Sequence, residues 1–196
     1  MKAVHVVSGT GLPLKRSDVD TDQIIPAEWL KRVERTGFEQ GLFATWRDDR
    51  SFVLNDERYV GASIIVAGPA FGVGSSREHA VWAIQQYGFD AVVAPSFSDI
   101  FRNNCAKNGL VAVVMPDPVV ERMWAAIDDD PATEITVDVE RLVVEVPAIG
   151  LTEPFPMDAS TQDRFLRGLD DVGITLTHAD AITTYEEQRP DWLTAR

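Results

Sequence analysis

The residues best suited to chemistry lie between positions 68 and 80, where a short apolar run leads into a glycine-rich turn and then a helical pattern. The turn contains GVGSSR, from Gly72 to Arg77. Backbone N–H groups and the dipole at a helix N-terminus favour an anion, and Arg77 adds a charge whose fork matches a carboxylate. The segment lacks the Gly-Lys-Ser/Thr of a Walker A loop, and Arg77 occupies the third glycine position of a dinucleotide fingerprint. It therefore predicts a site for a carboxylate or a phosphate.

The same residues also fit a purely structural interpretation. Ser75 and Glu78 have the spacing of a capping box, in which the serine bonds forward and the glutamate bonds back. Because a cap needs only one serine, the cluster of two serines, an arginine and two glycines favours the ligand site without excluding the cap. Ser96 and Asp99 repeat the spacing without such a cluster, and there we expect a helix cap.

Metal chemistry has weak support in this sequence. Asp20 and Asp22 could ligate a hard cation, but two acids alone do not make a magnesium site, and turn or cap chemistry fits them equally well. Cys105, the one cysteine, falls on the apolar side of a helical pattern and is expected to be a buried core residue. We expect structural roles for His79 and His178, and no metal bound by this chain.

The composition indicates one ordinary globular unit. The chain has 196 residues, of which 45% are hydrophobic and 25% charged, and its net charge is −13. Such an acidic chain lacks the basic footprint of a protein that binds nucleic acid or an anionic membrane. Its apolar runs are too short to span a bilayer or to form a signal peptide. We expect a cytoplasmic protein that binds neither nucleic acid nor membrane.

The order of elements predicts an α/β fold that places the turn at the end of a strand. Strands are expected at residues 3–7 (turned by residues 8–11), 62–67, 91–94 and 110–115, of which those at 62–67 and 91–94 should be buried. Helices are expected at 75–87, 96–107 and from 117. Strands that alternate with helices imply parallel pairing with crossover helices.

The remaining segments extend this core. Residues 28–50 lack a sustained period and should form a loop with helical turns. Residues 134–138 and 141–146 alternate like an antiparallel pair. Helices near 159–169 and 178–188 close the chain, the last with Thr177 and Asp180 at capping spacing.

Four segments, in the same order along nearly the whole chain, resemble signatures of the aconitase superfamily. They are GVGSSREHA at 72–80, VDTDQIIP at 19–26, PSFSDIF at 95–101, and GITLTH at 173–178 followed by Ile182 and Tyr185. The chain is similar to the swivelling domain of that superfamily and, at its C-terminal end, to small subunits of bacterial 3-isopropylmalate dehydratases. The resemblance implies one swivelling domain over residues 1–196, with a central, largely parallel sheet, flanking helices, a substrate loop near 28–38 and a C-terminal helical extension.

The resemblance also implies half of an active site. Small subunits of this family pair with a large subunit that carries a [4Fe–4S] cluster, and together they isomerise 2-isopropylmalate and 3-isopropylmalate in leucine biosynthesis by dehydration and rehydration. By analogy, Ser75 is the base that moves the carbon-bound proton, and Arg77 holds the substrate carboxylate and stabilises the alkoxide. Ser76, Gly74 and Asp22 are implied as substrate contacts. A serine needs such preorganised positive charge to ionise, and a lone cysteine cannot hold the cluster, so this chain is expected to bind no cofactor.

The substrate stays open within one chemical class. The resemblance implies that the loop near 28–38 reaches over the substrate, with Arg32, Arg35 and Thr36 close to it. Apolar surface for an isopropyl branch is available from three residues, Leu30, Val33 and Phe38. Either arginine could instead bind a third carboxylate or face solvent. The small subunit of a homoaconitase or of a citraconate or methylmalate hydratase is therefore an alternative, and a non-catalytic carboxylate-binding module is a second one.

Overall fold

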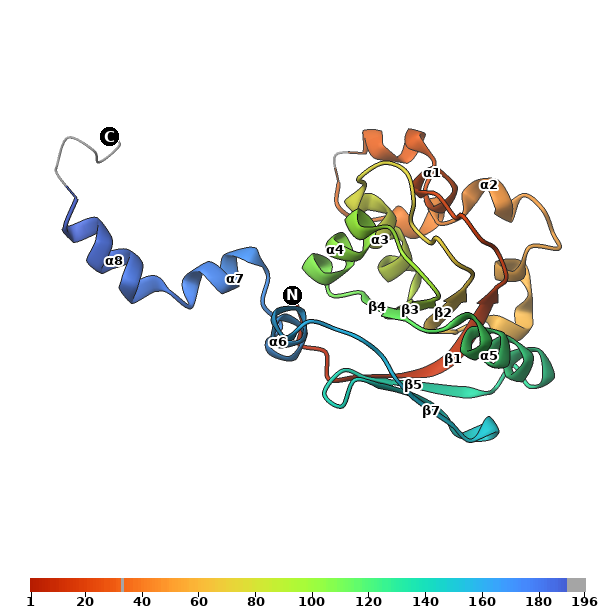
Figure 1. The fold of residues 1–196 in the computed structure, drawn as a ribbon. Coiled ribbons are helices and arrows are strands. Elements are labelled where there is room, and N and C mark those ends of the chain that lie inside the picture. The colour runs from red at the N-terminus through yellow and green to blue at the C-terminus, as the bar shows by residue number, and fades with distance from the viewer. Residues whose placement is uncertain (33, 190–196) are drawn as a thin grey trace.

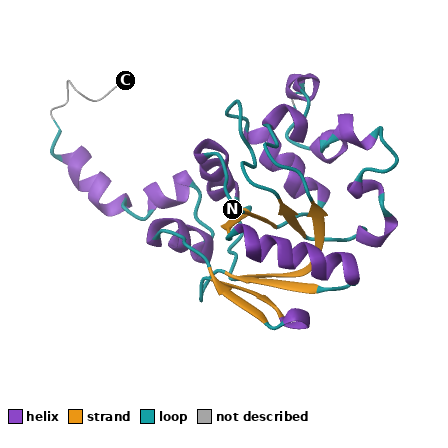
Figure 2. Ribbon diagram, turned by 45° about the vertical axis from the view of Figure 1, so that its right-hand side comes forward, coloured by secondary structure: helices purple, strands orange, loops and turns teal. Residues whose placement is uncertain are grey.

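The computed structural model describes residues 1–32 and 34–189, and its centre is a seven-stranded mixed sheet (Figure 1, Figure 2). The strand order is β4-β3-β2-β1-β5-β6-β7. The strands are β1 (Val6–Leu14), β2 (Ile64–Ala67), β3 (Ala91–Ala94), β4 (Val111–Val114), β5 (Glu134–Asp138), β6 (Val143–Val146) and β7 (Leu151–Pro154). With helices flanking this sheet, the predicted α/β class is confirmed.

Strands β1 to β4 form the parallel part of the sheet. β2, β3 and β4 are the runs IIVA, AVVA and VAVV and are buried almost throughout, as expected for strands covered on both faces. The helices after them are α3 (Glu78–Tyr87) and α4 (Asp99–Asn108), which pack together, and α5 (Asp117–Asp129), which packs on β1 and β2. The predicted alternation of strand and helix is therefore confirmed.

Strand β1 is longer than predicted, and the expected turn at residues 8–11 is wrong. The strand continues through Gly9 and Gly11 to Leu14. A Cβ on Gly9 would lie 2.2 Å from Ser63 Oγ, and a Cβ on Gly11 would lie 2.7 Å from Ile127 Cδ1. These glycines therefore permit close packing around the strand and do not reverse the chain.

The other part of the sheet is antiparallel. β5 pairs with β1, and β6 pairs with β5 as predicted for residues 134–146. β7, which was not predicted, pairs with β6 after the 3-10 turn η5 (Pro147–Ile149). Its sequence LTEP has only one buried residue, Leu151, so it lacks the apolar alternation that marks a strand.

The long connection from β1 to β2 consists of short helical turns, as expected for residues 28–50. They are α1 (Thr21–Ile24), η1 (Ala27–Lys31), η2 (Phe38–Gly41), α2 (Ala44–Arg47), η3 (Val53–Asn55) and η4 (Glu57–Tyr59). Buried Phe38, Leu42 and Phe43 attach this connection to the core, and η2 packs on α3. The connection therefore lies beside the helix that follows the glycine-rich turn.

After β7 the chain forms α6 (Ala159–Arg167), which packs on the body through the buried Phe165. Two more helices follow, α7 (Asp171–Leu176), which was not predicted, and α8 (Ala179–Glu187). Both project away from the sheet (Figure 1). The predicted cap of α8 is wrong, because Thr177 Oγ1 donates back to Ile174 O at 2.6 Å. Within the described ranges, the helices are all too short or too polar to cross a membrane.

Candidate active site at the carboxyl ends of the parallel strands

The segments singled out in the sequence meet at one edge of the parallel sheet. β1, β2 and β3 are parallel neighbours, so the loops that follow them leave the sheet at the same edge. Ligands of open α/β sheets bind in the crevice outside the carboxyl ends of the strands. Residues 19–26, 72–80 and 95–101, three of the four motif segments, therefore share one location.

Hydrogen bonds join the first two of these segments directly. Gly72 N donates to Val19 O at 2.7 Å, and Thr21 N donates to Val73 O at 2.9 Å. The buried Thr21 also donates from its Oγ1 to Ser75 O at 3.1 Å. The position of Ser75 is therefore set by a segment far from it in the sequence.

An ion pair links the side chains of the same two segments. Arg77 Nη1 donates to Asp22 Oδ1, and the Arg77 side chain is 17% exposed while that of Asp22 is 56% exposed. The more exposed Asp22 thus holds the partly buried guanidinium of Arg77 in place. Because a guanidinium has five N–H donors, this pair leaves donors for a second carboxylate.

Ser75 and Ser76 are exposed and lie before the helix. α3 begins at Glu78 with Arg77 as its extended N-cap, so the predicted helix start at residue 75 is wrong. The capping box is wrong as well: among the described residues no side chain caps α3, and Glu78 Oε1 accepts from Asn108 Nδ2 at 3.0 Å instead. The two serines therefore do not cap α3, and they lie just before its N-terminus, where negative charge is favoured.

Two glycines give this turn its shape. Gly72 has φ +75° and Gly74 has φ +95°, a region that residues with a side chain rarely adopt. A Cβ on Gly72 would lie 2.2 Å from Phe101 Cγ, whereas a Cβ on Gly74 would lie 3.5 Å from its nearest neighbour, Thr21 Oγ1. Conformation thus requires glycine at both positions, and packing requires it at Gly72 too.

The third motif segment braces the turn. Ala70 N donates to Ser96 Oγ at 2.9 Å, and Phe101 packs edge-on against Phe71 with ring centroids 5.4 Å apart. The expected cap from Ser96 to Asp99 is therefore wrong. Ser96 serves the neighbouring loop, because the parallel strands place the two loops side by side.

For the acidic segment the structure supports the cap. Asp20 is the N-cap of α1: its Oδ1 accepts from Gln23 N at 2.8 Å, and its own N–H donates to Gln23 Oε1 at 3.0 Å. Asp22 is occupied by its ion pair with Arg77. Among residues 1–32 and 34–189, no group of three or more His, Cys, Asp or Glu side chains is placed to hold a metal ion.

Cys105 and His79 have structural positions. Cys105 is buried in α4, which confirms the prediction, and burial raises the pKa of its thiol well above the ordinary value. The His79 ring lies 5.3 Å from the Phe38 ring and 4.8 Å from the Trp82 ring. Burial lowers the pKa of His79, which favours the neutral imidazole in this aromatic cluster.

The arginines of the predicted substrate loop lie against aromatic rings. Arg32 Nη1 donates to Gly37 O at 3.2 Å, and its guanidinium carbon lies 4.5 Å from the Trp29 ring centroid. The guanidinium carbon of Arg35 lies 5.6 Å from the Trp82 ring centroid. A contact of either arginine with substrate stays a prediction.

The apolar residues of this loop differ in their placement. Phe38 is 1% exposed and packs under α3, so the prediction that it offers surface to a ligand is wrong; its ring is part of the core. Leu30 is half-buried and Thr36 is exposed. Val33 lies outside the described residues.

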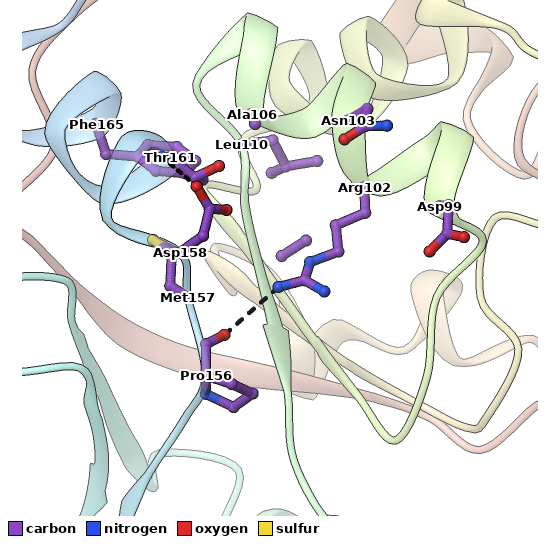
Figure 3. Close-up of a pocket in the computed structure, with 11 residues that line it drawn as sticks. Asp99, Arg102, Asn103, Ala106, Leu110, Pro156, Met157, Asp158, Thr161 and Phe165 are labelled. Carbon is purple, nitrogen blue, oxygen red and sulfur yellow. Dashed lines mark hydrogen bonds between the residues drawn. The ribbon is translucent and has the colours of Figure 1, made fainter.

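A cavity of about 630 Å³ lies elsewhere, between α4 and α6, and its lining does not include the predicted site residues (Figure 3). Asp158 in its wall accepts from Thr161 N at 2.9 Å as the N-cap of α6, and Arg102 Nη2 donates to Pro156 O at 3.5 Å. The Arg102 bond links α4 to the segment that precedes α6, whereas the Asp158 bond caps α6 itself. In the glycine-rich turn, by contrast, Gly74, Ser75 and Ser76 are exposed.

Sequence reasoning missed the residues that hold the site in place. Thr21 binds the Ser75 carbonyl, Phe101 fills the space beside Gly72, and Ser96 binds the loop after β2. All three lie inside the motif segments, so their type and place were visible. Their partners were not, because each partner belongs to another segment of the chain.

Two family models match this chain. The model described as "Aconitase C-terminal domain" matches residues 1–118, which include the three segments that meet at the turn. The model for the C-terminal domain of 3-isopropylmalate dehydratase small subunits matches residues 171–193, which include α7 and α8. The first match therefore covers the body up to the start of α5, and the second covers the C-terminal helices.

Similar proteins match over nearly the full length. The 3-isopropylmalate dehydratase small subunit of Parafrankia sp. (strain EAN1pec) is 58% identical over 193 residues, 98% of each chain. That of Thermobifida fusca (strain YX) is 55% identical, again over 98% of each chain. The crystal structure of a 3-isopropylmalate dehydratase from Methanocaldococcus jannaschii matches with a TM-score of 0.64 and 25% identity, over 92% of this chain and 99% of that one.

Proposed function

The chain belongs to the family of 3-isopropylmalate dehydratase small subunits, with a body of the aconitase C-terminal domain type, and we propose that it supplies the proton-transfer half of an active site completed by a large subunit. As such a subunit it acts in leucine biosynthesis, as part of the hydro-lyase that interconverts 2-isopropylmalate and 3-isopropylmalate. The observation that supports the proposal best is the exposed Ser75, held by Thr21 beside the Arg77–Asp22 pair.

Ser75 is proposed as the base. Its ionised Oγ takes the carbon-bound proton, the C–H electron pair becomes the double bond of the unsaturated diacid, and hydroxide leaves from the adjacent carbon. When water adds back in the other orientation, the Ser75 hydroxyl returns a proton to carbon. The partly buried Arg77 and the N–H groups at the start of α3 stabilise the alkoxide, because fixed dipoles and charge act strongly where water is limited.

Arg77 is proposed to bind a substrate carboxylate as well. Asp22 occupies one side of the guanidinium, so the carboxylate takes the remaining N–H donors. Asp22 thereby orients the fork and lowers the freedom that Arg77 would lose on binding. Gly74 and Ser76, next to Ser75 in the turn, are proposed to contact the same substrate.

The electrophile is proposed to reside on the large subunit. Loss of hydroxide from carbon needs a Lewis acid, which a [4Fe–4S] cluster would supply when bound there. This chain has a single cysteine, Cys105, buried with a raised thiol pKa, and so it does not suit cluster binding. A cytoplasmic location belongs to the same proposal, because a reducing compartment protects both the cluster and the free thiol.

The test is to assemble the chain with its large subunit and to measure the hydration of isopropylmaleate. Ser75→Ala should lower kcat by about 10²–10⁴-fold with an unchanged urea midpoint. Arg77→Lys keeps the charge and loses the fork, so kcat/KM should fall strongly. The control is Ser160→Ala, at an exposed serine of α6, which should change nothing. Near-normal turnover by Ser75→Ala would refute the base, and tight carboxylate binding without turnover by the wild-type complex would favour a binding module.

Branch selectivity is proposed to come from the loop near residues 28–38. Each methylene in an apolar pocket contributes about 1–3 kcal/mol of discrimination, so methyl-substituted malates should be used less well than isopropylmalate but not rejected. The comparison is kcat/KM for isopropylmalate, a methylmalate and homoaconitate. A preference for the tricarboxylate would contradict the isopropyl assignment and would instead give Arg32 or Arg35 a carboxylate to bind.

A further inference from the structure

Residues 170–188 form an arm that lies outside the folded body. Its helices α7 and α8 extend away from the sheet in both views (Figure 1, Figure 2), and in the described chain neither helix has a buried residue. The base of the arm is attached: Asp171 pairs with Arg164 at 2.8 Å and with Lys107 at 3.6 Å. The arm therefore has a fixed origin, while its helices face solvent.

The arm presents large apolar side chains to that solvent. Val172 is 66% exposed, Leu176 64%, Ile182 37% and Tyr185 65%. The first two are four positions apart and the last two are three apart, so each pair shares one face of its helix. Helices of six and nine residues are too short to be stable alone in water. They need a surface against which these faces are buried.

Charge discriminates between the possible partners that could bury the apolar faces of the arm. Positions 170–188 contain five acidic residues and no lysine or arginine, and the whole chain has a net charge of −13. A second copy would therefore bring acid against acid, which opposes association. A groove with an apolar floor and a basic rim would match both the apolar faces and the acidic residues of the arm.

The family models connect the arm with small subunits that are separate chains. The aconitase domain model ends at residue 118, whereas the arm falls in the segment matched by the C-terminal domain of 3-isopropylmalate dehydratase small subunits. The arm thus lies in a segment that is matched by a model of these small subunits and not by the aconitase domain model. A small subunit that is a separate chain must be held on its partner by non-covalent contacts, and an exposed amphipathic arm is suited to this task.

We propose that the arm docks into an apolar, basic-rimmed groove of the large subunit and thereby sets the affinity between the two subunits. This inference rests on the proposed function, because it takes the large subunit as the partner. Within the described ranges, the ion pairs of the arm lead to α4 and α6, whereas Arg77 pairs with Asp22. Loss of docking should therefore weaken assembly and leave the chemical step of the assembled enzyme unchanged.

The experiment compares the double variant Leu176→Ser/Tyr185→Ser with the control Val60→Ser, which alters a valine that is 81% exposed on the body. All three substitutions keep the charge. Calorimetry gives the Kd for the large subunit, and titration of activity gives kcat at saturation. The double variant should raise Kd by about tenfold or more with unchanged kcat and an unchanged urea midpoint. The control should match the wild type.

An unchanged Kd in the double variant would overturn the inference. A concentration-dependent dimer of the isolated chain in sedimentation, abolished by the double variant, would overturn it too, because the arm would then bind a second copy. The two proposals fail separately. A wild-type pair that binds without turnover counts against the proposed function, while calorimetry with the variants still decides the role of the arm.

Discussion

Substitution of Gly72 by alanine tests whether the packing of the glycine-rich turn on α4 holds the active site. Gly72 has φ +75° and donates its N–H to Val19 O at 2.7 Å. A Cβ there would lie 2.2 Å from Phe101 Cγ, and the Phe101 side chain is only 1% exposed. The ring therefore has little room to withdraw, and either the ring or the turn must shift.

The expected cost has two parts. The left-handed backbone costs an alanine about 1–2 kcal/mol, and overpacking a filled core position costs about 1–3 kcal/mol, so Gly72→Ala should lower the free energy of unfolding by about 2–5 kcal/mol in sum. Gly88→Ala is the matched control. Gly88 has φ +117°, and a Cβ there would meet no described atom within 4 Å, so only the backbone part applies.

The assay is urea denaturation of the isolated chain, followed by turnover of the assembled enzyme. The difference between the two variants isolates the packing part and should be about 1–3 kcal/mol. Turnover should fall in Gly72→Ala, because Ser75 follows in the same turn, and should be kept in Gly88→Ala. Equal stability losses in the two variants, or full turnover in Gly72→Ala, would refute the packing argument.

Three further substitutions test the supports of the site. Asp20→Ala removes the capping box of α1 and should lower the free energy of unfolding by about 1 kcal/mol in urea denaturation; no change would contradict the cap. Phe38→Ala empties a core position under α3 and should cost about 3–5 kcal/mol in the same assay, and a cost below that of the cap would argue against its core role. Burial lowers the pKa of His79 below 6.5, so the unfolded chain binds a proton at this residue more readily than the folded chain does. The stability contributed by neutral His79 is therefore present above pH 6.5 and is lost as the pH falls through the folded pKa. His79→Gln should flatten this part of the profile of urea midpoint against pH, and an unchanged slope would contradict the assignment.

The amino-acid sequence alone predicted the elements whose signals are local. The runs at β2, β3 and β4 are apolar throughout and rich in β-branched residues, so they indicate buried strands without reference to any partner. The helical periods of α3, α4 and α5 between them imply crossovers, and these imply parallel pairing. The burial of Cys105 followed from its place on a helix face in the same way.

Features that depend on a distant neighbour were predicted poorly. Gly9 and Gly11 have the composition of a turn, but their use is close packing against Ser63 and Ile127. The spacings of a serine or threonine and an acid at 75–78, 96–99 and 177–180 all fit caps, and the structure forms none of them. A capping pattern shows only that a side chain can reach the backbone, and it carries no information about competing partners.

The candidate site likewise combines features that the sequence predicts locally with features that depend on distant neighbours. The residue types in the turn, two serines, an arginine and glycines, determined the chemistry that the site can perform, because charge and hydrogen-bonding capacity are properties of each side chain. Only the tertiary structure brought Asp22 to Arg77 and Thr21 to the Ser75 carbonyl, across more than fifty residues of sequence. The physical reason is that the parallel order of β1, β2 and β3 puts their carboxyl ends at one edge, and strand order is decided by the packing of the whole sheet rather than by any one segment.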